Sequence, residues 1–460
     1  MSLPALLIPI ENQVREMDAK FLLAWMAAQQ KFPVYFGWKT EIENTLYQFP
    51  KGIYLAKSFA PQNLKVLKLL KGLGHTVVAW DEEGLVHYPP QVYWGRRITP
   101  EVLPYLDHII AWGNDYIELL ETYQKPFPVP ISNLGNPRGD CLRPDFRSLY
   151  NTPIQEMKKQ YGEFILINTN FPSVNSFDPT LQLAQRNPDN QRLTMARGSH
   201  GMPTEFAKDR FEYKYRLFQA FLEMVGALAT KFPHTTIILR PHPSEDMTPW
   251  TEITQKHSNV LVENRGSVIP WILASTVLIH NGCTTGVEGV AVGKPVLWYQ
   301  PFQPEEFESN LPNQLSVRCD SFQALVESIK TAQQNPDLLT LKDSKVKLAN
   351  FLTAMEGPFA SERIVQLLLN IAQAPLPTQR TAFKHIGFLL KSMHRHFKKS
   401  RQQKTGALRY HKDFQEQRFP KVHLSDLEDK MEIFKNIFTL ANPINISVIK
   451  KNVFKIIASS

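Results

Sequence analysis

The chain has few cysteines, three among 460 residues, and they lie far apart at Cys141, Cys283 and Cys319. An odd and scattered set fits neither a disulfide framework nor the paired spacing of a zinc site, so we expect a reducing compartment. No run of about 18 apolar residues occurs, which excludes a hydrophobic membrane-spanning helix. The apolar residues 1–10 lack the basic segment and cleavage site of a signal peptide and predict a first strand. The expected location is the cytoplasm.

The formal net charge of +9 is unevenly distributed along the chain. Residues 376–460 hold 17 Lys and Arg against 6 Asp and Glu, whereas residues 1–375 hold 35 and 37. The body is thus nearly neutral, and the C-terminal part is basic. A length of 460 residues exceeds that of one core and predicts two domains plus additional segments.

Short apolar segments alternate with helical ones along the first 150 residues. The predicted strands are residues 5–9, 34–37, 53–56, 76–80 and 105–112. The predicted helices are residues 14–29, 41–49, 61–72 and 114–122. Such alternation predicts an α/β fold with a mostly parallel sheet and helices on both of its faces.

A second alternating series follows a loop-rich connection at residues 126–151. Its predicted strands are residues 164–168, 236–240, 259–262, 275–279 and 295–299, and its predicted helices are residues 206–231, 268–273 and 322–333. Two Rossmann-like halves predict a ligand cleft between domains. Residues 171–204 are a long polar insertion in which prolines interrupt any helix, so we expect disorder or a functional lid there.

The clearest functional pattern lies where the strand predicted at residues 275–279 ends. Small and hydroxyl residues open a helix there, namely Asn281, Gly282, Thr284 and Thr285. Such residues, with the free N–H groups of a helix N-terminus, form a site for an anion, most often phosphate. Glu288 lies one turn into the helix, where an acidic residue can reach the hydroxyls of a ribose. Taken alone, the segment fits an ordinary capped strand–helix connection equally well.

A second pattern follows the strand predicted at residues 236–240. The string Arg240-Pro241-His242-Pro243 places an arginine and a histidine at the strand end between two rigid prolines. Arginine offers a fork of donors suited to phosphate or carboxylate, and histidine donates to an anionic oxygen or moves protons near neutral pH. Together with the turn about 40 residues downstream, the string favours a nucleotide-sugar site over coincidence.

Further strings stand along the chain: Ile8-Pro9-Ile10-Glu11, Asp81-Glu82-Glu83-Gly84, Gly135-Asn136-Pro137-Arg138, Ile167-Asn168-Thr169-Asn170-Phe171 and Ala360-Ser361-Glu362-Arg363-Ile364. With the two patterns above, they resemble the surface carbohydrate biosynthesis proteins, bacterial glycosyltransferases of the GT-B type related to capsule and lipopolysaccharide Kdo transferases. The resemblance covers about residues 5–370. It implies a GT-B fold, in which two Rossmann-like domains face a cleft, followed here by a basic, helical C-terminal extension.

The resemblance also implies a separate role for each part of the chain. Residues 1–150 are expected to receive the acceptor, residues 151–375 to hold the nucleotide sugar, and residues 376–460 to form the basic tail. Several relatives use CMP-activated nonulosonic acids such as Kdo, whose donors carry a carboxylate beside the phosphate. No Asp-x-Asp string of the metal-dependent transferases stands near the site, so neither a metal nor another cofactor is expected.

By the same resemblance, each residue of the donor site has an expected role. Arg240 and His242 are assigned to the phosphate or carboxylate, and Thr284 and Thr285 to the phosphate. Asn281 and Gly282 are expected to shape the loop and Glu288 to bind the ribose.

The catalytic carboxylate has two candidates, beside His242 as a catalytic group. Asp209 resembles in its spacing the nucleophile of retaining Kdo transferases, although it also fits a solvated helical residue in a run of charges. Glu82 and Glu83 follow a strand of the first domain, and Glu83 is the one chosen as the general base of an inverting enzyme, although it also fits a polar turn residue. Both alternatives remain open for each residue.

The tail has two interpretations as well. Its basic residues Arg380, Lys384, Lys391, Arg395, Lys398, Lys399, Arg401 and Lys404 alternate with Phe383, Phe388, Leu389, Leu390 and Phe397. This mixture predicts a basic amphipathic helix that lies on anionic lipid, at the inner face of the plasma membrane, or one that packs its apolar face on the body. No nucleic-acid-binding motif accompanies the charge.

The sequence therefore predicts a metal-independent glycosyltransferase of cell-surface polysaccharide synthesis that transfers a sugar from a nucleotide donor to a glycan or lipid-linked glycan. A transferase of CDP-activated polyol phosphate, a GT-B-type sugar epimerase and a non-catalytic glycan-binding subunit are the alternatives.

Overall fold

The computed structural model describes residues 3–87, 89–187, 189–303, 307–308, 310–339, 341, 343–373, 382–405, 419–438 and 442–459. The chain forms two compact units. Unit 1 comprises Met1–Leu85, Arg97–Leu149 and Ala349–Ser460, and unit 2 comprises Val86–Arg96 and Tyr150–Leu348.

Among the described residues, unit 1 holds an eight-stranded sheet with the order β15-β16-β2-β1-β3-β4-β5-β6. Its strands are β1 (Ala5–Ile10), β2 (Val34–Trp38), β3 (Gly52–Ala56), β4 (Thr76–Ala79), β5 (His108–Ala111), β6 (Ile131–Asn133), β15 (Ile444–Lys450) and β16 (Val453–Ala458). The strands β1 to β6 pair in parallel. Every residue of β1 is buried, as is typical of a parallel strand covered on both faces. The parallel α/β fold predicted for this part is confirmed.

The helices of unit 1 include α1 (Gln13–Gln29), α2 (Lys39–Asn44), α3 (Leu64–Gly72), α15 (Ala360–Gln373), α16 (Ala382–Thr405) and α18 (Leu424–Ile437). Helix α1 is buried along most of its length. The ring of Phe21 on α1 lies 5.4 Å from that of Phe36 on β2 and 5.5 Å from that of Phe434 on α18. The core of unit 1 thus joins the first strands of the chain to its last helix.

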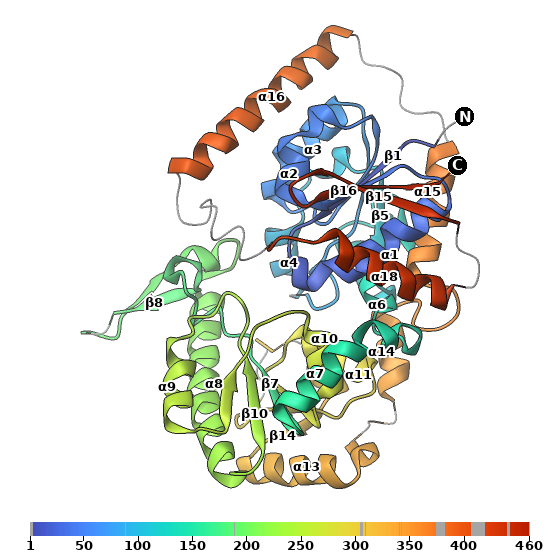
Figure 1. Cartoon of the computed structure of the whole chain (residues 1–460). Coiled ribbons are helices and arrows are strands. Elements are labelled where there is room, and N and C mark those ends of the chain that lie inside the picture. The colour runs from blue at the N-terminus through green and yellow to red at the C-terminus, as the bar shows by residue number, and fades with distance from the viewer. Residues whose placement is uncertain are drawn as a thin grey trace. The chain divides into compact units, whose positions relative to one another are not determined.

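The C-terminal part of the chain completes the sheet of unit 1. Strands β15 and β16 form an antiparallel hairpin, and β16 pairs antiparallel with β2, so that the red C-terminal strands lie beside the blue N-terminal ones (Figure 1). Asn452 turns the hairpin with a φ of 55°, a conformation that asparagine tolerates. Residues 376–460 contain the expected helical segments, α16 and α18. The sequence predicted only helices in this part of the chain, and it did not predict the hairpin. Of the predicted basic residues, Arg380 and the side chains of Lys384 and Lys404 lie outside the described part, as does that of Phe383.

Residues 349–373 also belong to unit 1, which differs from the predicted domain boundary at residue 375. The carboxylate of Asp140 accepts hydrogen bonds from the backbone N–H groups of Ala360 and Ser361, at 2.7 and 2.8 Å, at the start of α15. Its burial raises the pKa of Asp140 to about 6. The ring of Phe359 packs 5.2 Å from that of Phe146. Because these partners lie more than 200 residues apart, a boundary drawn from local pattern could not include them.

Unit 2 is built on a six-stranded sheet with the order β11-β10-β7-β12-β13-β14 among its described residues. These strands are β7 (Phe164–Asn168), β10 (Thr236–Arg240), β11 (Val260–Val262), β12 (Val277–His280), β13 (Val296–Tyr299) and β14 (Val317–Cys319), and all pair in parallel. The helices around it include α8 (Thr204–Lys231), α9 (Thr248–Lys256), α10 (Val268–Ala274), α11 (Thr284–Ala291), α12 (Asn310–Leu315) and α13 (Phe322–Gln334). This is the second Rossmann-like series predicted from the sequence.

The insertion at residues 171–204, described except for residue 188, folds against the core of unit 2. It carries the short antiparallel strands β8 (Ala184–Arg186) and β9 (Leu193–Met195). Phe171, Leu183 and Ala184 belong to the core of unit 2. The ring of Phe171 lies 5.3 Å from that of Phe221 on α8. A few apolar anchors hold the segment down, although most of its residues are polar.

Candidate functional site

The sequence-predicted donor residues come together at the carboxyl ends of β10, β7 and β12, three neighbouring strands of unit 2. The strand register aligns Arg240, Asn168 and His280 side by side as the last residues of these strands. Since residues in register point to the same face of a sheet, the three form one lateral row. Their exposed fractions are 8%, 3% and 0%. A buried polar row at this edge is where open α/β sheets bind ligands.

Asn168, in the middle of this row, is the strongest indication of a ligand. Among the described residues, neither its side-chain oxygen nor its side-chain nitrogen has a hydrogen-bond partner. Buried amides are normally paired, because an unpaired buried polar group is costly. A polar ligand that hydrogen-bonds the amide would compensate for that cost. Asn168 belongs to one of the strings that carry the family resemblance, but no role could be predicted for it from the sequence.

Arg240 lies in the predicted place but is engaged by the protein itself. Its guanidinium donates to the backbone carbonyls of Glu263, Arg265 and Gly266 at 3.0–3.1 Å and stacks 4.9 Å from the ring centre of Trp271. Burial lowers the pKa of Arg240 to about 10. These contacts favour a role in holding the loop that follows β11, and they leave few donors for the predicted phosphate or carboxylate.

His242 is half-buried just past β10, and a hydrogen bond defines its tautomer. The backbone N–H of Ser244 donates to its Nδ1 at 3.2 Å, so the neutral ring carries its proton on Nε2. A proton on Nε2 is suited to donation to an anionic oxygen, the role predicted for this residue.

The loop that carries His242 is held by Glu245, a residue that the sequence did not single out. Its Oε1 accepts from the backbone N–H groups of His242 and Phe171 at 3.0 Å and from the hydroxyl of Thr169 at 2.9 Å. Its Oε2 accepts from the indole N–H of Trp250 at 3.0 Å. Burial raises the pKa of Glu245. One carboxylate thus ties the loops after β7 and β10 to helix α9.

The glycine turn before α11 is fixed by His280. The backbone N–H of Gly282 donates to Nδ1 of His280 at 2.9 Å, and Nε2 of the same ring lies 2.8 Å from Oγ of Ser316. Burial lowers the pKa of His280 to about 3, so the ring is neutral. Gly282 has a φ of 88°, and Gly286 leaves no room for a side chain, because a Cβ there would lie 2.7 Å from Nε2 of His280. The turn therefore needs its glycines.

The remaining predicted donor residues lie at and after this turn. Thr284 and Thr285 are the first two residues of α11, half-buried, and Glu288 is the fifth, buried at 7% exposure. Asn281 donates from Nδ2 to the carbonyl of Asn170 at 3.2 Å, which joins the loops after β12 and β7. Its Oδ1 is buried and has no partner among the described residues. Besides the amide oxygen of Asn168, a second buried oxygen without a described partner thus lies just before the start of α11 in the sequence.

A buried ion pair beside the turn was not predicted. Lys214 on α8 and Glu308 lie 2.7 Å apart, and their side chains are 7% and 4% exposed. Burial alone would raise the pKa of Glu308, but Lys214 lowers it below its ordinary value. A Cβ on Gly282 would come within 2.8 Å of Oε2 of Glu308 and 3.2 Å of Oδ1 of Asn313. These residues are separated by up to 99 positions, so no local pattern could reveal their proximity to the turn.

The two candidate catalytic carboxylates belong to different units. Asp209 lies exposed near the start of α8 in unit 2. Glu83 belongs to unit 1, where it forms an ion pair with Arg15 at 2.8 Å. Burial alone would raise the pKa of Glu83, but Arg15 lowers it to about 2. Because Arg15 engages Glu83 and stabilises its charged form, this ion pair does not favour Glu83 as the general base.

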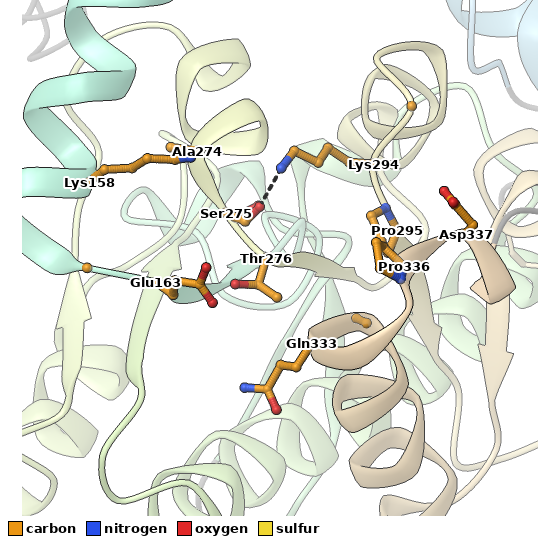
Figure 2. A pocket seen from close by; sticks show the side chains of 13 residues that line it. Lys158, Glu163, Ala274, Ser275, Thr276, Lys294, Pro295, Gln333, Pro336 and Asp337 are labelled. Atoms are coloured by element: carbon orange, nitrogen blue, oxygen red, sulfur yellow. Dashed lines mark hydrogen bonds between the residues drawn. The ribbon is translucent and has the colours of Figure 1, made fainter.

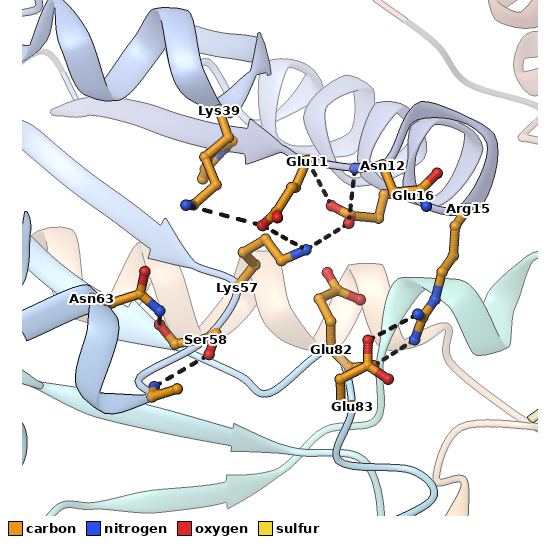
Figure 3. Close-up of polar contacts among 12 residues, drawn as sticks. Glu11, Asn12, Arg15, Glu16, Lys39, Lys57, Ser58, Asn63, Glu82 and Glu83 are labelled. Atoms are coloured by element: carbon orange, nitrogen blue, oxygen red, sulfur yellow. Dashed lines mark hydrogen bonds and ion pairs between the residues drawn. The ribbon is translucent and has the colours of Figure 1, made fainter. Parts of the chain in front are cut away.

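Unit 1 carries a charged cluster of its own at the carboxyl ends of β1, β3 and β4 (Figure 3). Buried Glu16 accepts from Lys20 and from Lys57, each at 2.8 Å, and the ammonium of Lys20 also lies 3.0 Å from Oε1 of Glu82. These lysines lower the pKa of Glu16 well below its ordinary value, against the effect of burial. Oε2 of Glu82 is buried and has no partner among the described residues. Among the described carboxylates at positions 81 to 83, which follow β4, Glu82 is therefore the one with a buried oxygen that lacks a partner.

A cavity of about 570 Å³ in unit 2 lies elsewhere (Figure 2). It is lined by Glu163, Thr276 and Pro295, which precede β7, β12 and β13, and by Lys294, whose ammonium donates to the carbonyl of Ser275 at 2.8 Å. Because these residues stand at the amino ends of the strands, the cavity is at the opposite edge of the sheet from the polar row. It does not belong to the predicted donor site.

Among the described residues, no group of three or more His, Cys, Asp or Glu side chains is arranged to hold a metal ion. The groups at the polar row and the glycine turn include amides, hydroxyls, an imidazole N–H, backbone N–H groups and the carboxylate of Glu288. These are groups suited to phosphate and to the hydroxyls of a sugar or ribose.

No protein-family model matches the chain, and no curated protein sequence matches it. Solved structures with a similar chain path include the wall teichoic acid polymerase TagF, with 11% identity, a TM-score of 0.41 and coverage of 70% of this chain and 72% of that one. The UDP-GlcNAc 2-epimerase from Methanocaldococcus jannaschii has 11% identity, a TM-score of 0.47 and coverage of 80% and 100%. The S. aureus protein MnaA, solved with UDP, has 13% identity, a TM-score of 0.47 and coverage of 82% and 100%.

With TM-scores below 0.5 and identities of 11–13%, no activity is transferred from these proteins to this chain. The α/β assignment rests on the strand order and register of the two sheets.

Proposed function

We propose that the chain is a glycosyltransferase of cell-surface polysaccharide synthesis, in which the carboxyl edge of the unit 2 sheet binds a nucleotide-activated sugar. The observation that carries the proposal is the buried amide of Asn168, which has no partner in the described part of the chain and lies between Arg240 and His280, beside the glycine turn of α11. A ligand that fills this position must offer both donors and acceptors. A nucleotide sugar does so through its phosphates, ribose and sugar hydroxyls.

The donor that we propose is a CMP-activated nonulosonic acid such as Kdo, following the resemblance of the sequence strings. The engagement of Arg240 by three backbone carbonyls weakens the support for a carboxylate clamp at that residue. His242, Thr284, Thr285 and the backbone N–H groups of the turn are then the groups that would bind the anionic part of the donor, with Glu288 at the ribose. We further propose that unit 1 receives the glycan or lipid-linked acceptor through its charged cluster, and that the reaction needs no metal.

A panel of nucleotides tests the donor class. We expect CMP to raise the melting temperature of the full-length protein more than CDP, UDP or GDP at equal concentration, because a ligand that binds only the folded state stabilises it by mass action. A preference for CDP would instead favour the transfer of a polyol phosphate, and a preference for UDP would favour an epimerase. Indifference to all four nucleotides would refute the donor site and leave a glycan-binding subunit.

Two substitutions test the roles of the predicted residues. His242→Ala and Glu288→Ala are each expected to lower sugar transfer from the preferred donor by about a hundredfold or more, as is typical of residues that act in proton transfer or donor binding. Circular dichroism should show that both variants stay folded. Undiminished turnover in both variants would contradict these assignments. Glu252→Ala, an exposed glutamate on α9, is the matched control and should leave transfer unchanged.

A covalent sugar adduct on Asp209, detected by mass spectrometry during turnover, would establish a retaining mechanism with that residue as the nucleophile. The absence of such an adduct, with inversion of the anomeric centre in the product, would instead favour a general base among the carboxylates of unit 1.

A further inference from the structure

Helix α16 of unit 1 has two faces with different surroundings. One face lies on α2 and α3, where the ring of Phe388 fills the space above Gly72 so closely that a Cβ on this glycine would lie 2.2 Å from it. On the same face Ser392 is fully buried, and the guanidinium of Arg395 lies 3.4 Å from the carboxylate of Glu43. Helix α16 is therefore docked on unit 1 by a polar and aromatic face.

The opposite face of α16 carries a continuous apolar stripe. Ile386, Leu390, Met393 and Phe397 are 52%, 61%, 39% and 68% exposed. Their spacing of four, three and four residues places them in one line along the helix. Four of the twelve large hydrophobic side chains that are exposed in the described part of the chain thus lie on this one helix face. Of the apolar residues for which the sequence left lipid contact and packing on the body open, Phe388 packs on the body, whereas Leu390 and Phe397 are exposed on the opposite face.

Basic residues flank this stripe. Lys391, His394, Lys398 and Arg401 follow one another at helical spacing on the adjoining side of α16. The helix contains seven Lys and Arg residues and no Asp or Glu. A second copy of the chain that covered the stripe through its own α16 would bring two such positive helices together, which electrostatic repulsion opposes. An anionic lipid surface matches both the apolar stripe and the charge beside it.

No helix in the described part of the chain has the length and apolar character needed to cross a bilayer. We propose that α16 lies in the plane of an anionic membrane surface, with Ile386, Leu390, Met393 and Phe397 inserted at the boundary of headgroups and acyl chains, while its other face stays docked on α2 and α3. The proposal extends the expectation that the basic tail lies on anionic lipid, and it is compatible with the proposed lipid-linked acceptor. It does not require the transfer reaction, because binding is measurable without a donor.

Vesicle flotation with the full-length protein tests the proposal. We expect binding to vesicles that contain phosphatidylglycerol and none to vesicles of phosphatidylcholine alone, with the bound fraction falling as salt is raised. The double substitution Leu390→Glu and Phe397→Glu should weaken binding to the anionic vesicles by about tenfold or more, because it removes inserted apolar area and adds negative charge. Lys391→Glu with Lys398→Glu should also weaken binding, most strongly at low salt.

The matched control is Leu338→Glu with Val346→Glu, which changes two side chains of unit 2 that are 72% and 75% exposed. This control should bind vesicles like the unchanged protein. Equal binding of the Leu390 and Phe397 variant, or no binding of the unchanged protein to anionic vesicles, would overturn the proposal. So would a dimer in solution that the same double substitution dissolves, because the stripe would then be covered by a second copy. The variant should keep its nucleotide-dependent rise in melting temperature, so a failure of membrane binding is distinguishable from a failure of the donor site.

Discussion

Replacing Phe434 with alanine is expected to lower the free energy of unfolding by about 3–5 kcal/mol, the range for removing a phenylalanine from a packed core. Phe434 is fully buried on α18. Its ring lies 5.5 Å from that of Phe21 and 5.7 Å from that of Trp25, both on α1. The lost ring therefore leaves a cavity between the first and last helices of unit 1. Urea denaturation followed by tryptophan fluorescence measures the change.

The matched control for this prediction is Phe397→Ala, the same substitution at a side chain of unit 1 that is 68% exposed. It should change the stability by less than about 0.5 kcal/mol. A similar, small loss in both variants would show that α18 contributes little to the core. If Phe434→Ala behaves as expected, deletion of residues 376–460 would unfold unit 1, and such a deletion is not a clean test of membrane binding.

Replacing Glu245 with alanine should destabilise the protein by about 3–5 kcal/mol and greatly weaken nucleotide binding. The substitution leaves the N–H groups of His242 and Phe171, the hydroxyl of Thr169 and the indole N–H of Trp250 without their acceptor. Each unsatisfied buried donor costs about 1–3 kcal/mol before local relaxation. Because the loops after β7 and β10 lose their common anchor, the polar row is no longer held in place. Thermal unfolding and nucleotide titration measure the two effects.

Two variants sharpen this test. Glu245→Gln keeps one acceptor oxygen but turns a donor toward another donor, so its loss of stability should be smaller than that of the alanine variant and clearly measurable. Glu252→Ala, on the exposed side of α9, should change neither stability nor binding. An alanine variant at position 245 that binds nucleotide with unchanged affinity would mean that the loops are held by other contacts.

Much of the fold could be predicted from local pattern. Buried strands such as Phe164–Asn168 are short apolar runs bounded by polar residues, and this pattern is what parallel sheets require. The hairpin β15–β16 could not be assigned in the same way, because its partner β2 lies more than 400 residues away. The pairing depends on the edge of β2 that β1 leaves unpaired, and no local pattern near residue 444 indicates that edge.

The same distinction between local pattern and distant contacts applies to the candidate site. The glycine turn of α11 and His242 were predicted, because each is a contiguous string at a strand end. The contacts of Arg240, the anchoring by Glu245 and the Lys214–Glu308 pair were not, because each depends on how distant loops fold against one another. A glutamate three residues after a histidine is too common a pattern to signal a buried anchor.

Asn168 gives the most direct test of the proposed donor site. Asn168→Leu preserves the approximate size of the side chain and removes a buried amide that no described residue pairs with. We expect the melting temperature of the free protein to hold or rise, because an unsatisfied polar group is removed, and the affinity for the preferred nucleotide to fall by about tenfold or more. Isothermal titration calorimetry, with Asn335→Leu on an exposed position as the control, measures both affinities. Unchanged nucleotide affinity in Asn168→Leu, or a destabilised free protein, would contradict the assignment of the polar row as a ligand site.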